Sequence, residues 1–502
     1  MTDISGMQFV LFLILPLTAF SWDILFVNVF AGGSHQTVGA YTANVLADHG
    51  HSVTYVSTNL PKYLRSQIKK VTLTENERVG NHFLNSVVDD PDFSLGKALS
   101  NIKIMLGLCG PFFEDPFVQH LMTTNAKFDA MISLGALYDS CSFALAHKLK
   151  IPGRIVQFPA PSTFPAQIAS YGLPIYHSSV NHDGVTYQDN EDVKASPLLR
   201  VKNLLKSCGI MVFEDLIQRF MIGPDIYPHV PDYPGYSAIF QEVGLVLMHY
   251  HPLVDAPVPF GPGVVALAGT LCTEYEPEKL GEELRQFIDT SEGFVYISFG
   301  SHIHTLLDIE KEILIGAFAK MSFKVVWKMK FEVPNLPENV KTFKWLPQTT
   351  LLRHPKLRAF ITHGGYASKV EAMCAGAPML VMPRVAFDQY LNAEQIFKRQ
   401  LGDKIVSLRD SSSEEVYGKV VNISGSTITG NSKALQRQLL LTRTTDEQLL
   451  GNLDIVISGK KLLPGYQPFY EYFYLDIILI PIVVIYLIKY LVQKIRSLPL
   501  MS

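Results

Sequence analysis

The chain has 502 residues, of which 48% are hydrophobic and 18% charged, which is enough for about two or three packed domains of about 150 residues each. This composition excludes disordered and collagen-like proteins. The 43 Lys and Arg residues against 46 Asp and Glu residues give a net charge of −3, without the basic block that a nucleic-acid footprint requires. The five cysteines form no C-x-x-C pair, so the sequence favours neither a zinc site nor a disulfide-dense scaffold, and it allows two disulfides at most.

The first predicted element is a signal peptide over residues 1–21. Residues 9–20 are an apolar run of twelve, too short to span a bilayer, and Ala19 and Ser21 are the small residues that a signal peptidase selects. The segment before this run lacks Lys and Arg, which leaves an uncleaved anchor or a buried first strand as alternatives.

An alternation of strands and helices follows. Residues 24–30 form an apolar run of strand length, AGGSHQ interrupts it, a helical stretch reaches about residue 48, and residues 52–57 alternate as a second strand. The pattern returns over residues 128–152, whereas residues 175–260 show weak periodicity and predict only loops and irregular helices. We therefore expect a first Rossmann-like domain with a parallel, doubly wound sheet over residues 22–260.

A second α/β block follows the Gly-Pro-Gly sequence at residues 261–263. It opens with FVYISFGS and continues through KVVWKM, TFKWL, AFITHGG and MLVMP, each followed by a helical or loop segment. These strand-like runs predict a second Rossmann-like domain over residues 261–465.

The C-terminal segment predicts a membrane anchor. Residues 470–492 are mostly apolar and long enough for a hydrocarbon core of about 30 Å. Aromatic residues cluster at 470–474, and Lys489, Lys494 and Arg496 come at its far end, which is typical of an aromatic belt and of positive-inside orientation. We expect a single-pass type I protein of the endoplasmic reticulum or another secretory membrane, with lumenal domains and a cytosolic tail at residues 493–502. A buried C-terminal helix is the alternative.

A glycine turn in the second half predicts an anion site. His363-Gly364-Gly365 lies between the strand-like AFIT and a predicted helix over residues 366–375. A strand, a glycine turn and a helix N-terminus present free backbone N–H groups and a positive dipole to a phosphate, and His363 and Ser368 add donors. Taken alone, the three residues are equally explained by a plain β-turn.

The block from Trp345 to Gln389 resembles the donor-binding signature of the UDP-glycosyltransferases, in the membrane-anchored animal form of UDP-glucuronosyl and UDP-glucosyltransferases. The signal peptide, the G-S-H turn at residues 33–35, FVYISFGS and the Y-L-D-I sequence before the terminal helix extend the resemblance over the whole chain. The resemblance implies a GT-B fold and hexosyl transfer of the EC 2.4.1 type. It also implies that the first domain binds the acceptor and the second binds the UDP-sugar.

By matching positions, the resemblance assigns three residues to the nucleoside. Trp345 would stack on the uracil ring, Gln348 would lie beside the nucleoside, and Glu371 would accept hydrogen bonds from the ribose diol. A core tryptophan and an exposed helix glutamate are the structural alternatives for Trp345 and Glu371.

The resemblance also assigns residues to the diphosphate and the sugar. The residues that would hold the diphosphate are Ser301, His363, Gly365 and Ser368. Asp388 and Gln389 would bind sugar hydroxyls, with a helix-capping Asp388 as the alternative. The family commonly has Asn where this chain has Ala367, which removes one phosphate contact.

The acceptor side matches the family less well. His35 fits the position of the catalytic base, and a helix N-terminus helps to keep its imidazole neutral. A capping or pocket-lining histidine is the alternative. The acid that orients this histidine in the family falls on Leu134, which cannot do so. Asp139 follows five residues later, so it is either the partner acid or an ordinary first-turn helix acid.

We expect an inverting transferase in which His35 deprotonates an acceptor hydroxyl. The second half has no Asp-x-Asp motif, so we expect no metal and no cofactor besides the UDP-sugar co-substrate. A catalytically weak or inactive UDP-sugar-binding lumenal protein is the alternative, favoured by Leu134 and Ala367; a sugar-nucleotide epimerase is a weaker third hypothesis.

The partners expected are the UDP-sugar, a small lipophilic acceptor and the membrane. The sequence leaves open the sugar (glucose or glucuronic acid), the acceptor, the disulfide pairing and the oligomeric state, a homo-oligomer included. Asn422 heads the only N-x-S/T sequon, so one N-glycan at most is expected.

Overall fold

The computed structural model describes residues 21–30, 33–61, 63–80, 107–135, 139–158, 171–173, 197–255, 260–272, 278–300, 306–331, 333–384, 387–463 and 474–496. Several predictions lie partly or wholly outside these residues: the signal peptide up to residue 20, Ser301, the side chain of His35, the start of the predicted membrane helix at residues 470–473, and the end of the tail from residue 497.

The first domain is built on a parallel sheet. Within the described ranges it has seven strands in the order β3-β2-β1-β4-β5-β6-β7, and every pairing is parallel. The strands are β1 Asp23–Asn28, β2 Ser52–Ser57, β3 Lys69–Thr72, β4 Ala130–Leu134, β5 Gly153–Phe158, β6 Leu245–Met248 and β7 Val264–Ala266. This confirms the doubly wound α/β prediction for the first half.

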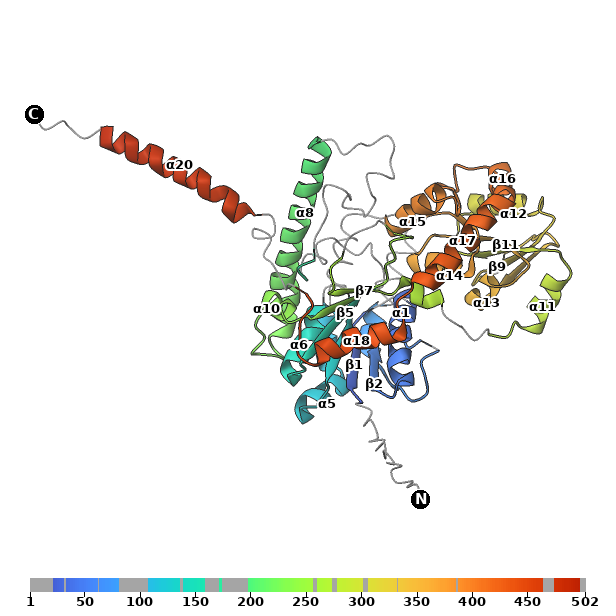
Figure 1. Ribbon diagram of the computed structural model, residues 1–502. Coiled ribbons are helices and arrows are strands. Elements are labelled where there is room, and N and C mark those ends of the chain that lie inside the picture. Colours follow the sequence, from blue (N-terminus) through green and yellow to red (C-terminus); the bar gives the residue numbers. More distant parts are fainter. Residues whose placement is uncertain are drawn as a thin grey trace, which may run out of the picture.

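Helices cover both faces of this sheet (Figure 1). They include α1 Gly33–Asp48, α4 Cys109–Glu114, α5 Pro116–Thr124, α6 Asp139–Leu149, α8 Pro197–Ile217, α9 Gly223–Ile226 and α10 Tyr236–Phe240. Alternate residues of β1 enter different cores: Leu25 and Val27 join one hydrophobic cluster, and Ile24 and Phe26 join the other. Because a strand turns successive side chains to opposite faces, a strand buried on both sides is apolar throughout, as the run at residues 24–30 is.

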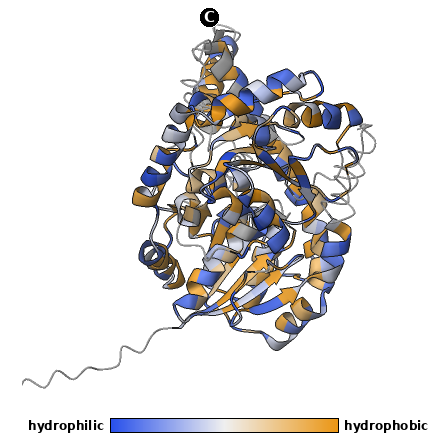
Figure 2. Cartoon of the chain, turned by 90° about the vertical axis from the view of Figure 1, so that its right-hand side faces the viewer, coloured by the Kyte–Doolittle hydropathy of each residue, from blue (hydrophilic) through white to orange (hydrophobic). Residues whose placement is uncertain are grey.

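The second domain repeats this plan. In the described part, its sheet has six strands in the order β10-β9-β8-β11-β12-β13, which are β8 Phe294–Ser298, β9 Lys324–Lys328, β10 Val340–Phe343, β11 Leu357–Thr362, β12 Met379–Val381 and β13 Gly402–Lys404. Its helices are α11 Glu282–Asp289, α12 Asp308–Phe318, α13 Gln348–Leu352, α14 Tyr366–Ala375, α15 Phe387–Lys398, α16 Ser413–Ile423 and α17 Ser426–Thr442. Figure 2 shows hydrophobic strands enclosed by helices whose colouring changes from hydrophobic to hydrophilic around the helix.

The structure corrects the domain boundary predicted at residue 261. β7 pairs with β6 in the first sheet, so the first domain continues to residue 266. α18, Asp446–Ile457, also returns to this domain, because Leu449 and Leu453 pack in the cluster that contains Ile24 of β1. An apolar helix stripe does not indicate which of two sheets it will cover, which is why the sequence placed α18 in the second domain.

In the described part of residues 175–260, the π-helix Gln218–Ile222 and the short helices α9 and α10 fit the expectation of loops and irregular helices, whereas α8, a helix of 21 residues, does not. Its periodicity is weak since apolar residues lie on both of its sides. Met211 and Ile217 are buried, whereas Leu205 and Phe213 are 66% and 59% exposed.

Two disulfides join helices that lie far apart in sequence. Cys109 of α4 bonds to Cys141 of α6, and Cys272 bonds to Cys374 of α14. Cys208 of α8 is the one free cysteine.

The C-terminal helix α20, Leu475–Arg496, extends away from both domains. None of the helices in the described part of the chain meets the length and apolarity needed for a membrane crossing. The transmembrane helix at residues 470–492 stays a prediction.

Candidate functional site

The candidate donor site lies where the second sheet reverses its strand order. β8 and β11 are neighbours, with Ser298 paired to Thr362, and the following strands of the chain lie on opposite sides of this pair. In open α/β sheets, ligands bind outside the carboxyl ends of the strands at such a point. The predicted glycine turn directly follows β11.

The turn at residues 363–365 requires its glycines. Gly364 has a φ of +81°, and a Cβ there would lie 2.5 Å from Cγ1 of Val381. A Cβ at Gly365 would lie 2.5 Å from Nε2 of His363, and one at Gly300, after β8, would lie 2.9 Å from its Cε1. The His363 imidazole therefore lies beside glycines that follow two neighbouring strands, and Gly365, the N-cap of α14, makes no side-chain capping hydrogen bond.

Three of the residues predicted to bind the UDP-sugar meet beside α14. The Gln348 side chain, from the first turn of α13, donates from Nε2 to Glu371 Oε2 at 2.6 Å and to Ser368 Oγ at 3.1 Å. The Tyr296 hydroxyl of β8 donates to Gln348 Oε1 at 3.0 Å. The structure thus brings Gln348, Ser368 and Glu371 together, and it adds Tyr296 as the group that orients the glutamine.

Trp345 is 60% exposed, so the structure excludes a core tryptophan. The Nζ of Lys328 lies 5.0 Å from its ring centroid, and Trp345 borders an open cavity of about 300 Å³ that includes Phe343 and Pro347. An exposed indole suits stacking on a planar base.

Burial changes the acidity of both predicted carboxylates. Burial raises the pKa of Glu371, while the hydrogen bond from Gln348 and the charge of Lys328 oppose this rise. Burial likewise raises the pKa of Asp388, opposed by backbone hydrogen bonds and by the charge of Lys369. Two desolvated carboxyl groups at the edge of a parallel sheet are typical of a functional site.

Asp388 and Gln389 lie in the first turn of α15, against the glycine turn. The backbone oxygen of Gln389 lies 3.2 Å from the place that a Cβ of Gly364 would take. Its side-chain Oε1 accepts a hydrogen bond from the backbone N of Arg384 at 2.8 Å. The structure therefore brings the two predicted sugar-binding residues to the turn that would hold the diphosphate.

Asn392, which no sequence motif singled out, binds the turn directly. Its Nδ2 donates to the backbone oxygen of Gly364 at 2.8 Å. Asn392 lies four residues after Asp388 and so on the same face of α15, a spacing that could have identified it.

On the acceptor side, His35 belongs to the first turn of α1, after β1. β1 and β4 form the switch point of the first sheet, and α1 contacts α14 across the two domains. Leu134 ends β4, and its Cδ1 lies 2.8 Å from the place of a Cβ at Gly39, one helical turn after residue 35. Leu134, which stands where the family has its acid, therefore faces the side of α1 that carries residue 35.

Asp139 is buried at the start of α6. Its two carboxylate oxygens accept hydrogen bonds at 2.6 Å from the Ser133 and Tyr171 hydroxyls. Burial and the charge of Asp139 raise the pKa of Tyr171. These partners suffice to hold a buried carboxylate, and a pairing of Asp139 with His35 stays a prediction.

Glu214 of α8 gives this region a pH-dependent stability. Burial, followed by the charges of Asp139 and Asp215, raises its pKa from 4.5 to about 8. The folded protein therefore holds a proton that the unfolded chain loses between these values, so the free energy of unfolding falls as the pH rises through this window.

Glu214→Gln should remove that loss. Below pH 4.5 the variant and the parent should have the same free energy of unfolding, and toward pH 8 the value for the variant should be higher. The difference should grow by about 1.4 kcal/mol for each pH unit within this window. Urea unfolding at both ends of the window measures this, with the exposed Glu415→Gln as control. A variant that is less stable than the parent at the alkaline end would contradict the assignment.

Among the described residues, no group of three His, Cys, Asp or Glu side chains is placed to hold a metal ion. The expectation that the reaction uses no metal stays a prediction.

The chain matches a known protein family over more than half of its length. The family described as UDP-glucoronosyl and UDP-glucosyl transferase matches residues 19–423. The UDP-glucuronosyltransferase 3A1 of Xenopus laevis is 27% identical over 514 residues, covering 93% of each chain.

Solved structures show the fold that this chain shares. The glycosyltransferase SnogD from Streptomyces nogalater has a TM-score of 0.57 at 16% identity and covers 87% of this chain and 100% of its own. LpCGTa in complex with UDP has a TM-score of 0.55 at 16% identity, with 87% and 100% covered. The chain therefore belongs to the UDP-glucoronosyl and UDP-glucosyl transferase family, and it is a glycosyltransferase of GT-B fold whose sugar donor is a UDP-sugar.

Proposed function

We propose that this enzyme transfers a hexose, glucose or glucuronic acid, to the hydroxyl group of a small lipophilic acceptor, with inversion at the anomeric carbon. The observation that carries the proposal is the cluster of Gln348, Ser368 and Glu371 along α14. This cluster offers a carboxylate for a ribose diol and neutral donors for a phosphate, on the helix whose N-terminus favours an anion.

In the proposed transfer step, one bond to the anomeric carbon forms and another breaks. His35 takes the proton of the acceptor hydroxyl, the oxygen forms a bond to the anomeric carbon, and the bond from that carbon to the diphosphate oxygen breaks. UDP leaves with the electron pair. Its charge is stabilised by the N–H groups of α14 and by His363. The contact of α1 with α14 supports this proposal, because it places the helix of the base beside the helix of the leaving group.

Incubating the full chain with UDP-glucose and UDP-glucuronic acid and a mixture of phenols and apolar alcohols tests the proposal. The expected products carry one hexosyl or one glucuronosyl residue in β-linkage, identified by mass spectrometry and by the NMR coupling of the anomeric proton. An α-linked product would contradict inversion. Binding of UDP without any product would favour the catalytically inactive alternative.

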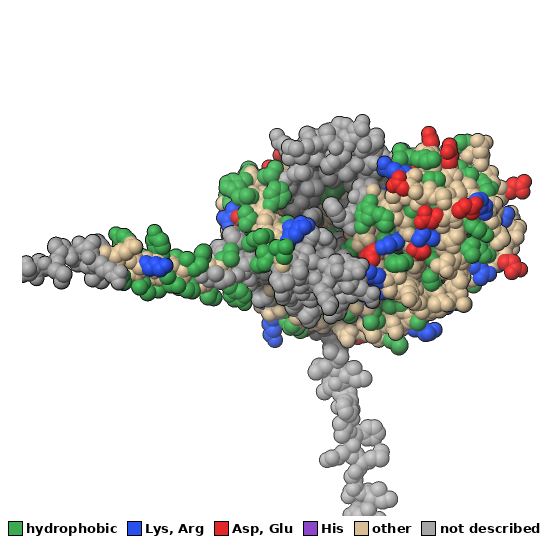
Figure 3. Space-filling model, turned by 90° about the horizontal axis from the view of Figure 1, so that it is seen from above, with side chains coloured by type: hydrophobic (Ala, Val, Ile, Leu, Met, Phe, Trp, Pro, Cys, Tyr) green, Lys and Arg blue, Asp and Glu red, His purple; other side chains and the backbone are tan. Residues whose placement is uncertain are grey.

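We also propose that the enzyme is a single-pass type I protein of a secretory membrane, anchored by α20. Hydrophobic side chains gather along α20 in Figure 3, and those described between Ile477 and Val492 are exposed. Two disulfides fit an oxidising compartment. Asn422, the sequon residue, is exposed near the end of α16.

In sealed microsomes the two domains should therefore resist added protease, and the C-terminal tail should be removed. An endoglycosidase should increase the mobility of the parent, while an Asn422→Gln variant should not respond to it. Digestion of the domains in intact vesicles would overturn the proposed orientation, and detergent-treated vesicles are the control for protease access.

A further inference from the structure

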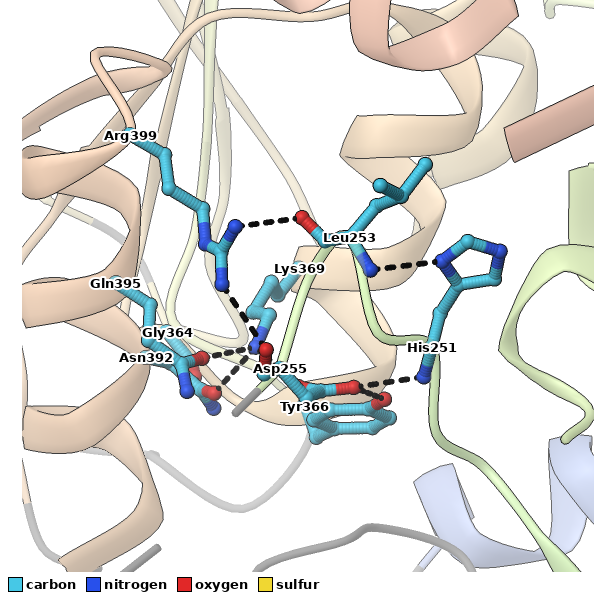
Figure 4. A network of polar contacts seen from close by, with 9 residues as sticks. All are labelled: His251, Leu253, Asp255, Gly364, Tyr366, Lys369, Asn392, Gln395 and Arg399. Carbon is cyan, nitrogen blue, oxygen red and sulfur yellow. Dashed lines mark hydrogen bonds and ion pairs between the residues drawn. The ribbon is translucent and has the colours of Figure 1, made fainter. Parts of the chain in front are cut away.

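A buried polar network joins the donor helix α14 to a loop of the first domain (Figure 4). At its centre, the Nζ of Lys369 lies 3.0 Å from Oδ1 of Asp255, with the two side chains 1% and 4% exposed. Lys369 also donates to Asn392 Oδ1 at 2.9 Å and to Gln395 Oε1 at 2.6 Å. An ammonium group has three N–H donors, so these three acceptors satisfy it fully.

Asp255 belongs to the chain of the first domain. It ends a segment of residues 249–255, here called the bridging loop, which follows β6 and precedes β7 in the first sheet. The bridging loop is nevertheless docked on the second domain, because Val254 packs in the hydrophobic cluster of Tyr366 and Val370.

Polar contacts hold the bridging loop in this place. Arg399, directly after α15, donates to the backbone oxygens of Leu253 and Asp255 at 2.8 and 2.9 Å. The second carboxylate oxygen of Asp255 accepts from the Tyr366 hydroxyl at 2.8 Å and from the backbone N of His251 at 3.0 Å. Both carboxylate oxygens of Asp255 therefore have partners. One binds Lys369, and the other binds Tyr366 at the start of α14 and His251 in the bridging loop.

The network reaches the donor turn through Asn392. The oxygen of this amide accepts from Lys369, and its Nδ2 donates to the backbone oxygen of Gly364. If Lys369 were removed, the amide would lose the contact that orients it, and its hydrogen bond to Gly364 would no longer be held in this geometry. The Lys369 charge also opposes the rise in the pKa of Asp388 that burial causes.

A buried ion pair is weak evidence for stability, since apolar residues of similar volume often serve a fold equally well. What this pair does offer is a fixed geometry between two elements from different domains. We propose that Lys369 is a positioning residue, which holds the donor turn in its binding geometry through Asn392 only while Asp255 of the bridging loop is docked. This inference rests on the proposed donor site at α14.

The test compares Lys369→Met with Lys419→Met in the full chain. Lys419 is a matched control, because its Nζ also lies 3.0 Å from an aspartate oxygen, that of Asp403, in the same domain. In Lys369→Met, the Kd for UDP and the KM for the UDP-sugar should rise by about ten- to a hundredfold, the effect of a small misplacement of binding groups. Hydrogen exchange of the peptide that spans residues 357–375 should become faster. Lys419→Met should change neither.

A double variant separates positioning from stability, since Lys369→Met alone leaves a buried carboxylate without its cation. Asp255→Asn with Lys369→Met removes both charges and keeps an oxygen for Tyr366 and His251. We expect its thermal midpoint to return toward that of the parent while UDP binding stays weak and exchange at the donor turn stays fast.

Recovery of UDP affinity together with the thermal midpoint would show a merely structural pair and overturn the inference. Parent-like UDP binding in Lys369→Met would do the same. If the parent itself binds no UDP, the proposed donor site is wrong, and the exchange rates at the donor turn alone decide whether the coupling exists.

Discussion

Replacing His35 with alanine should lower the turnover number by about 100- to 10,000-fold, the usual effect of a positioned acid–base group. The Kd for UDP should stay near that of the parent, because the donor cluster at α14 belongs to the other domain. Steady-state kinetics and calorimetry with UDP measure the two effects. A His35→Ala variant that keeps turnover within a few-fold would remove His35 from the role of base.

Asp139→Asn tests whether that base has a partner. If Asp139 orients the imidazole, its loss should resemble the loss of His35, and the double variant should be little worse than either single variant. Asp129→Asn is the control, because Asp129 lies just before the opposite end of β4 and binds the backbone N of Asp23. Unchanged turnover in Asp139→Asn would make Asp139 a structural residue that Ser133 and Tyr171 hold in place.

Glu371→Ala should weaken UDP binding by about 1 to 3 kcal/mol, the range for a charged hydrogen-bonding partner. In the structure, Oε2 of Glu371 accepts from Gln348, so the variant loses the acceptor for the ribose and also leaves Gln348 without this partner. His363→Ala should have a similar effect, since its imidazole lies beside Gly365 of the turn and Gly300 after β8, where the diphosphate is proposed to bind.

The exposed Glu415 of α16 provides the control for Glu371, as Glu415→Ala should leave UDP affinity unchanged. Circular dichroism of each variant shows whether it has folded. Parent-like UDP affinity in both folded variants, Glu371→Ala and His363→Ala, would eliminate the proposed nucleotide site.

The strands and the donor turn could be predicted because their signals are local. The apolar run at residues 24–30 corresponds to β1, residues 52–57 correspond to β2, and the helix expected at residues 366–375 is α14. Buried parallel strands are apolar throughout, and a turn with positive φ at Gly364 requires glycine, so a few adjacent residues carry the information.

The domain boundary and α8 could not be predicted, because they depend on packing between distant segments. β7 has three residues, too few for a periodic pattern, and its place is set by pairing with β6. α8 exposes Leu205 and Phe213, so its apolar residues do not form the single stripe that marks a surface helix.

The partners of the predicted site residues were also beyond the sequence. Tyr296 and Gln348 are 52 residues apart, and Lys369 and Asp255 are 114 apart, yet each pair shares a hydrogen bond. Such contacts exist only after the strand order has brought the elements together. The family signature named the residues that would meet the donor, and the fold shows which residues hold them.

The return of α18 to the first domain affects how this protein can be divided. The chain passes between the domains near residue 267 and again near residue 443, and Thr444 Oγ1 donates to the backbone oxygen of Ala266 at 2.6 Å where the two passages meet. Residues 268–442 are therefore contiguous, but expressing them alone would remove the bridging loop, whose Asp255 pairs with the buried Lys369. The first domain is not contiguous, because a fragment that stops before α18 leaves the Ile24 side of its sheet without Leu449 and Leu453. A recombinant first domain needs residues 444–463 joined to residue 267 by a linker or supplied as a second peptide.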